Sequence, residues 1–300
     1  MEARPLSDQR ERPRQKVASH LARALARPLA ARVPPHAWRA LDRMRGQPWP
    51  YCVVAFHRIW DGNPRHGGDD ELSYPARAFS ALCRYWRDHF QILNLDCLLT
   101  RLAHGDPAPG PSVTLTFDDG YADNFEVAAP ILDQLEFSAT FFLPTGIIGR
   151  RVRFGWDAKL PAAPPLLSWD QVRQLHRAGF GIGSHTVTHA RLSETRGAAL
   201  DFELAASRRQ LELELGEPVR EFAYPFGGAA DCDATAREAV RRAGYRCCFS
   251  CHGGLVAAHE SPFHLRRFAV SPRYHPTPQA WSRAYTGLRW QSVPAASPHW

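Results

Sequence analysis

The chain has 300 residues, of which 44% are hydrophobic, enough for one barrel-sized domain with an extension. Its formal net charge is +7, and this charge is unevenly placed. Residues 1–48 contain eleven Lys and Arg against four Asp and Glu, whereas the rest of the chain has 26 of each kind. The basic character therefore belongs to the N-terminal segment, which argues against a basic nucleic-acid-binding domain, and we expect no nucleic-acid partner.

The N-terminal segment, residues 1–48, is predicted to be a basic, partly helical extension. Residues 17–32 alternate Ala, Leu and Val with Arg, so they lack the uninterrupted apolar run of a secretory signal peptide. No span is long enough to cross a bilayer, and we expect a cytoplasmic protein. Residues 17–32 suit a basic amphipathic helix that contacts an anionic membrane surface. A partly disordered arm or a helix packed on the domain is favoured over that contact, and a transit peptide stays open.

Seven strand patterns recur after residue 50, and helical patterns separate most of them. The helical patterns cover residues 75–88, 169–178, 194–215 and 234–243. Strands that alternate with helices indicate an α/β fold with parallel pairing, and seven units suit a closed or nearly closed (β/α)7 barrel over residues 49–273. Residues 274–300 are expected to form an irregular, Pro-rich C-terminal tail. The strand candidates are 52–57, 113–118, 139–143, 180–185, 221–224, 246–250 and 265–270.

Two short motifs end two of these strands. Thr-Phe-Asp-Asp-Gly contains Asp118 and Asp119, and Ser-His-Thr-Val-Thr-His contains His185 and His189, four residues apart. Taken singly, each is as well explained by a turn or by surface histidines. Together, at the carboxyl ends of parallel strands, they offer one carboxylate and two imidazoles, a set that binds a catalytic divalent metal and leaves a position for water. The second carboxylate is then free to act as a base, which predicts a metal-dependent hydrolase.

The order of three motifs resembles the polysaccharide deacetylases, the NodB-homology carbohydrate esterases, over roughly residues 50–273. The third motif is Glu-Phe-Ala-Tyr-Pro-Phe-Gly, which ends at Gly227. The resemblance implies a distorted (β/α)7 barrel and a polysaccharide or oligosaccharide substrate. It also implies that Asp118 is the base, that Asp119, His185 and His189 hold the metal, and that the backbone N–H of Phe226 helps to form the oxyanion hole. Such a donor set takes zinc, cobalt, nickel or manganese, and we expect zinc.

Two residues depart from that family pattern. Arg267 stands where the family's Leu-x-His motif has its acid histidine, and Ala223 stands where the third motif has the arginine that supports the base. We expect Arg267 to supply the missing cation. His57, at the end of the first strand, is the candidate general acid, with a structural role as the alternative. An acid on the N-terminal side of the domain resembles the subgroup that acts on poly-N-acetylglucosamine and other exopolysaccharides.

The leading functional prediction is N-deacetylation of an N-acetyl-hexosamine in a polysaccharide or glycan precursor. O-deacetylation of an acetylated polysaccharide and a sugar-binding barrel without catalysis remain alternatives. Trp156 or Trp169 is a candidate for lining the sugar subsite. The identity of the sugar, the length of the substrate and the oligomeric state stay open.

The seven cysteines are an odd number, and several lie in apolar runs. We therefore expect small buried thiols in a reducing compartment and no disulfide framework. Cys248 and Cys251 form a C-x-x-C motif, but no second pair of similar spacing supports a structural zinc site.

Overall fold

The computed structural model describes residues 48–64, 68 and 70–292, with no account of the side chains of 290–292. The predicted helix and membrane contact of residues 17–32 lie outside these residues and stay predictions. In the part of the chain that is described, no helix is both long enough and apolar enough to cross a membrane.

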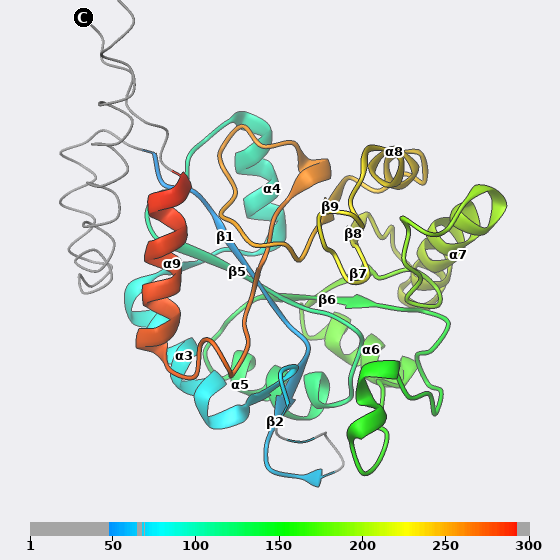
Figure 1. Ribbon diagram of the computed structural model, residues 1–300, viewed down its shortest axis with the longest axis horizontal. Helices are drawn as coiled ribbons and strands as arrows, with labels where there is room; N and C mark the ends of the chain where they lie inside the picture. The colour runs from blue at the N-terminus through cyan, green and yellow to red at the C-terminus, as the bar shows by residue number, and fades with distance from the viewer. Residues whose placement is uncertain (1–47, 65–67, 69, 293–300) are drawn as a thin grey trace, which may run out of the picture.

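A parallel sheet curled into a half-barrel forms the centre of the domain, and helices surround it (Figure 1). The strands follow the order β10-β1-β5-β6-β7-β8-β9, and each neighbouring pair is parallel. These are the seven strands expected from the sequence, so the predicted distorted (β/α)7 architecture is confirmed. The bounds are β1 Cys52–Phe56, β5 Ser112–Phe117, β6 Ala139–Leu143, β7 Gly181–Ser184, β8 Glu221–Ala223, β9 Cys247–Phe249 and β10 Phe268–Ala269.

Three short strands were not expected from the sequence. β4 Gln91–Ile92 pairs with β5 at the edge of the main sheet, and β2 Arg58–Trp60 pairs with β3 Ser73–Pro75 beside it. Strands of two or three residues are too short to show an alternating pattern, so the sequence gives little sign of them.

One segment after β9 reaches both edges of the curled sheet. Leu265 bridges to Phe249 of β9, and its N–H donates to the carbonyl oxygen of Cys248 at 3.1 Å. Three residues later β10 begins and pairs with β1, where Phe268 lies opposite Val54. Arg267 lies between these two contacts, and the segment therefore places it in the space between β9 and β1.

Helices pack around the outside of the sheet, and four of them match the sequence prediction. α6 has the predicted capping box, in which the Ser168 hydroxyl accepts from the Gln171 N–H and the Gln171 side chain accepts from the Ser168 N–H. α4 and α5 were not predicted. The helices are α3 Ala76–His89, α4 Leu95–His104, the π-turn Asn124–Ala128 with α5 Ala129–Asp133, the 3₁₀-helix Gly155–Lys159, α6 Trp169–Arg177, α7 Gly197–Leu215, α8 Ala234–Arg242, the 3₁₀-helix Pro262–His264 and α9 Pro278–Ser292.

The expectation of an irregular tail after residue 273 is wrong for residues 278–292, which form α9. This helix packs on α3 (Figure 1), and the fully buried indole of Trp281 meets Trp86 and Phe90 edge-on, with ring centroids 5.1 and 5.2 Å apart. Pro278 is the first residue of α9, where its missing N–H and fixed φ are compatible with a helix. The prolines that suggested irregular chain therefore mark the start of a helix.

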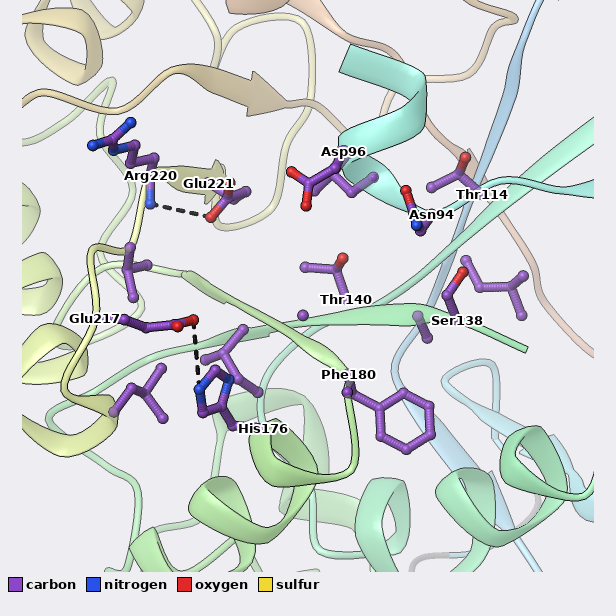
Figure 2. Close-up of a pocket in the computed structure, with 18 of the residues that line it drawn as sticks. Asn94, Asp96, Thr114, Ser138, Thr140, His176, Phe180, Glu217, Arg220 and Glu221 are labelled. Carbon is purple, nitrogen blue, oxygen red and sulfur yellow. Dashed lines mark hydrogen bonds and ion pairs between the residues drawn. The ribbon is translucent and has the colours of Figure 1, made fainter. Parts of the chain in front are cut away.

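Two cavities lie at opposite ends of the strands. Along the inner face of β7, Gly181 lines the cavity at the strand starts, Gly183 lies against Phe142, and His185 lines the cavity at the strand ends. A Cβ on Gly183 would lie 2.5 Å from the Phe142 ring, so glycine here makes room for the aromatic layer between the cavities. The cavity at the strand starts, about 480 Å³, has Thr140 and Glu221 in its wall and contains none of the predicted catalytic or metal-binding residues (Figure 2).

Candidate metal centre and active site

The cavity at the carboxyl ends of the strands has a volume of about 520 Å³. The structure brings together there predicted catalytic and metal-binding residues from four separate segments of the chain. Among the predicted catalytic and metal-binding residues, Arg267 alone is not in the wall; it is fully buried directly behind Asp118. The predicted residues that line the cavity are His57, Asp118, Asp119, His185, His189 and Phe226.

Asp119, His185 and His189 converge on one point and are all buried. Asp119 Oδ1 lies 3.5 Å from His185 Nε2 and 3.2 Å from His189 Nε2. His185 Nδ1 lies 2.7 Å from the carbonyl oxygen of Ala223. Because a carbonyl oxygen only accepts, Nδ1 carries the proton of the neutral ring, and Nε2 presents its lone pair toward Asp119.

This donor set fits a divalent metal. Asp119 Oδ1 is a buried oxygen with no hydrogen-bond partner among the described residues. Acceptors that face one another in a buried site are costly unless a cation lies between them. The Ala223 carbonyl also gives His185 the outer hydrogen bond that metal-binding imidazoles usually have. One carboxylate and two imidazoles suit zinc and its neighbours in the first transition series.

The backbone is strained at this site. Of the five non-glycine residues with positive φ in the described part of the chain, four lie here: Asp119, Thr186, His189 and Phe226. At Asp119 φ is 70°, immediately after β5 has ended at Phe117. In an extended strand two consecutive side chains point to opposite faces, so this left-handed turn is what brings both carboxylates to one cavity. Such strain is costly and gathers at functional sites.

Arg267 grips Asp118 with two parallel hydrogen bonds. Nη1 donates to Oδ1 at 2.8 Å and Nη2 donates to Oδ2 at 2.6 Å. The guanidinium is itself fixed, because Nε donates to the Ser250 carbonyl oxygen at 2.9 Å and Nη1 donates to the Thr116 hydroxyl at 3.0 Å. Burial raises the pKa of Asp118, but Arg267 outweighs it, and the pKa lies below its usual value. Asp118 is therefore ionised at neutral pH, and each oxygen keeps a lone pair for a further proton.

His57 follows β1, the strand next to β5, and lines the same cavity as Asp118. Its carbonyl oxygen accepts from the Asn124 side chain at 2.7 Å, which fixes the backbone at this point. The imidazole forms no hydrogen bond with another residue of the described chain and is open to the cavity. His264, which precedes Leu265-Arg266-Arg267, lies outside the cavity, with its ring 5.9 Å from that of His252.

Phe226 occupies the centre of a tight three-residue turn. The Gly227 N–H donates to the Pro225 carbonyl oxygen at 2.7 Å, and φ of Phe226 is 63°. The N–H of Phe226 donates to no acceptor in the described residues. A Cβ on Gly227 would lie 2.5 Å from the Cys251 nitrogen, so only glycine permits the chain to pass this close to the loop after β9.

Arg191 and Asp231 hold this turn from outside. The guanidinium carbon of Arg191 lies 3.9 Å above the Phe226 ring, a cation–π contact. Arg191 forms an ion pair with buried Asp231, which also accepts from the Gly228 N–H at 2.9 Å. These contacts hold the Phe226 side chain at the rim of the cavity, although it is 46% exposed.

Trp156 lines the cavity, whereas Trp169 begins α6 and does not. The Trp156 ring is stacked on Phe154 and meets His189 edge-on, with ring centroids 4.5 and 5.0 Å away. The other residues of the wall were not predicted from the sequence. The weak signal for one of them, Lys159, was its spacing of three residues from Trp156. The residues missed are Arg58, Asp70, Glu71, Leu72, Lys159, Tyr224 and Cys251.

All seven cysteines are free, and five of them are buried, as the sequence predicted.

Residues 105–248 match the family model for polysaccharide deacetylase. The chain contains a polysaccharide deacetylase domain. The match spans Asp118, Asp119, His185, His189 and Phe226, and the family recognised from the sequence motifs is confirmed. It begins after His57 and ends before Arg267. The roles of these two residues therefore depend on geometry.

Two proteins are similar to this chain in sequence, and one solved structure is similar in fold. The chain is 24% identical to YxkH of Bacillus subtilis over 221 residues, which are 73% of this chain and 71% of that protein. It is also 24% identical to the poly-β-1,6-N-acetyl-D-glucosamine N-deacetylase of Escherichia coli O157:H7 over 264 residues, 75% of this chain but only 38% of that protein. The structure of IcaB from Ammonifex degensii has the same fold, with a TM-score of 0.66 at 23% identity, over 79% of this chain and 98% of that one.

Proposed function

We propose that this polysaccharide deacetylase domain is metal-dependent and removes N-acetyl groups from N-acetyl-hexosamine units of a polysaccharide or glycan precursor. One observation carries the proposal: a buried Asp-His-His set converges in a cavity next to a second carboxylate that an arginine keeps ionised. The relative from Escherichia coli, named for N-deacetylation of poly-N-acetylglucosamine, supports the substrate class.

Asp119, His185 and His189 would hold the divalent ion, with zinc expected and cobalt, nickel or manganese as alternatives. When bound, the ion acts as a Lewis acid that polarises the acetyl carbonyl and makes water a better nucleophile. Asp118 accepts the proton of the attacking water, for which it must be ionised and must not be a ligand. The two hydrogen bonds from Arg267 to the Asp118 oxygens keep this carboxylate in place and ionised.

Two further groups stabilise the negative charge on the carbonyl oxygen and supply a proton to the leaving amine. The unpaired N–H of Phe226 donates to the carbonyl oxygen as it gains negative charge, an effect of about 3 kcal/mol in comparable sites. His57, in its protonated form, donates a proton to the departing amine. The carbon–nitrogen bond of the acetamide breaks, and the products are acetate and a free amino sugar.

Acetate release from N-acetylglucosamine oligomers tests this function. We expect release by the metal-loaded protein, loss of release after chelation, and recovery when zinc or cobalt is added. The Asp118→Asn variant is the matched control, because it keeps the size of the side chain and removes the base. Release from an O-acetylated polymer but not from the N-acetylated oligomers would reassign the protein as an esterase. No release from either, with sugar binding retained, would leave a binding barrel.

A further inference from the structure

In the part of the chain that the structure describes, Lys159 is the one Asp, Glu, Lys or Arg side chain of the active-site cavity that has no ion-pair partner. Arg58 forms ion pairs with Asp70 and Asp157, and Asp118 is held by Arg267. Lys159 lines the same cavity, is exposed, and has no ion-pair partner among the residues that the structure describes. Its ammonium is therefore a cation available to a ligand.

The use of lysine at this position is itself unusual for the chain. Only two of the 37 Lys and Arg residues are lysine, Lys16 and Lys159. Lys16 lies outside the described residues, so Lys159 is the single lysine of the described domain. Lysine differs from arginine in carrying a compact charge on a flexible stem, which suits an anion presented at variable geometry.

Trp156 and Lys159 belong to one short 3₁₀-helix, Gly155–Lys159. With three residues per turn, side chains three positions apart project on the same side. Both residues line the cavity, so the helix presents an aromatic surface and a cation together. Because the Trp156 ring lies 5.0 Å from that of His189, these groups adjoin the candidate metal centre.

Asp157, between them, anchors the helix in the interior. It is 1% exposed, forms an ion pair with Arg58 at 2.9 Å and accepts from the Tyr121 hydroxyl at 2.8 Å. The same hydroxyl accepts from the indole N–H of Trp156 at 2.9 Å. A buried ion pair seldom stabilises a fold more than apolar residues of the same size do. Its use here is better explained by the fixed position that it gives to the helix and to Trp156.

We propose that Trp156 and Lys159 form a subsite for an anionic sugar residue adjacent to the acetylated one. The indole, 37% exposed, offers a surface for the pyranose ring, and the ammonium binds a carboxylate or a phosphate ester on that sugar. The inference rests on the proposed function and adds to it that the substrate is an acidic polysaccharide.

The test compares kcat/KM for acetate release from three oligosaccharides of equal length. One is neutral and contains only N-acetylglucosamine, one alternates glucuronate with N-acetylglucosamine, and one carries phosphate esters. We expect a preference of the wild type for at least one anionic oligomer, weaker at high salt. Lys159→Gln should lower kcat/KM about fivefold for that oligomer, the effect of one exposed ion pair, and leave the neutral one unchanged. The anion whose advantage is lost identifies the group that Lys159 binds.

Two controls separate charge from structure. Lys159→Arg should keep most of the preference because it keeps a cation. Arg151→Gln removes another exposed cation that does not line the cavity, and it should change nothing. The inference is overturned if the wild type releases acetate from the neutral oligomer with the same kcat/KM as from both anionic oligomers. It is also overturned if Lys159→Gln lowers kcat/KM equally for all three oligomers. In both cases the proposed function stands. Failure to release acetate from any oligomer would instead reject the proposed function.

Discussion

Asp118 and Arg267 form a buried two-point ion pair, with N–O distances of 2.8 and 2.6 Å, although 149 residues separate them in the chain. Arg267 reaches Asp118 because the segment that carries it bridges β9 and β1. The third motif has Ala223 where its family pattern has arginine, and the carbonyl oxygen of Ala223 is bound to His185. The cation beside Asp118 thus comes from the segment just before β10, which makes Arg267 the residue whose removal is most informative.

Replacing Arg267 with methionine should move the acidic limb of the kcat/KM profile to higher pH. With the guanidinium absent, burial remains and raises the pKa of Asp118. A carboxylate acts as a base only above its pKa. As the pH falls, the variant should therefore lose activity at a higher pH than the wild type does. We also expect a loss of about 3–5 kcal/mol of stability, because an unpaired buried carboxylate is left. Arg267→Lys is the control and should move the limb less. An acidic limb in the methionine variant that coincides with that of wild type would contradict the role given to Arg267.

His57→Gln should lower kcat by roughly 10²–10³ and leave the metal content unchanged, because general acid catalysis is lost while the ligands remain. His264→Gln is the matched control, since His264 lies outside the cavity. Steady-state rates across pH and metal analysis check this. Wild-type turnover in the His57 variant would leave His57 as a structural residue.

Gly227→Ala should lower kcat by about 10²-fold, the usual effect of losing one oxyanion donor. Its φ is +62°, and a Cβ would lie 2.5 Å from the Cys251 nitrogen, so the Phe226 turn must shift. Metal affinity should persist because no ligand moves. Gly253→Ala is the control, since a Cβ there meets no atom within 4 Å. Equal rates for the two variants would show that the turn has no part in the reaction.

The sequence predicted the strands and the convergence of Asp119, His185 and His189 well, because both follow from local patterns. An apolar run marks each long strand, and polar residues directly after it must lie at the carboxyl end of a parallel sheet. The left-handed backbone at Asp119, which brings both adjacent carboxylates to one cavity, is not encoded in such a pattern.

Other features depend on contacts that no local pattern encodes. α9 was missed because proline was taken as a sign of irregular chain, although Pro278 opens the helix and Trp281 completes the core. Lys159 carries no motif, and only the 3₁₀ geometry and the cavity wall show that it accompanies Trp156. The Arg191 contact with the Phe226 ring likewise joins two segments that are distant in sequence.

The division of labour between the two adjacent carboxylates is the central claim, and metal content measures it most directly. Purified wild type, Asp118→Asn and Asp119→Asn are each depleted of metal and titrated with zinc, with binding followed by calorimetry. We predict one tightly bound ion per chain in wild type and in Asp118→Asn, and weak or absent binding in Asp119→Asn. Loss of the ion in Asp118→Asn, with binding kept in Asp119→Asn, would contradict the account.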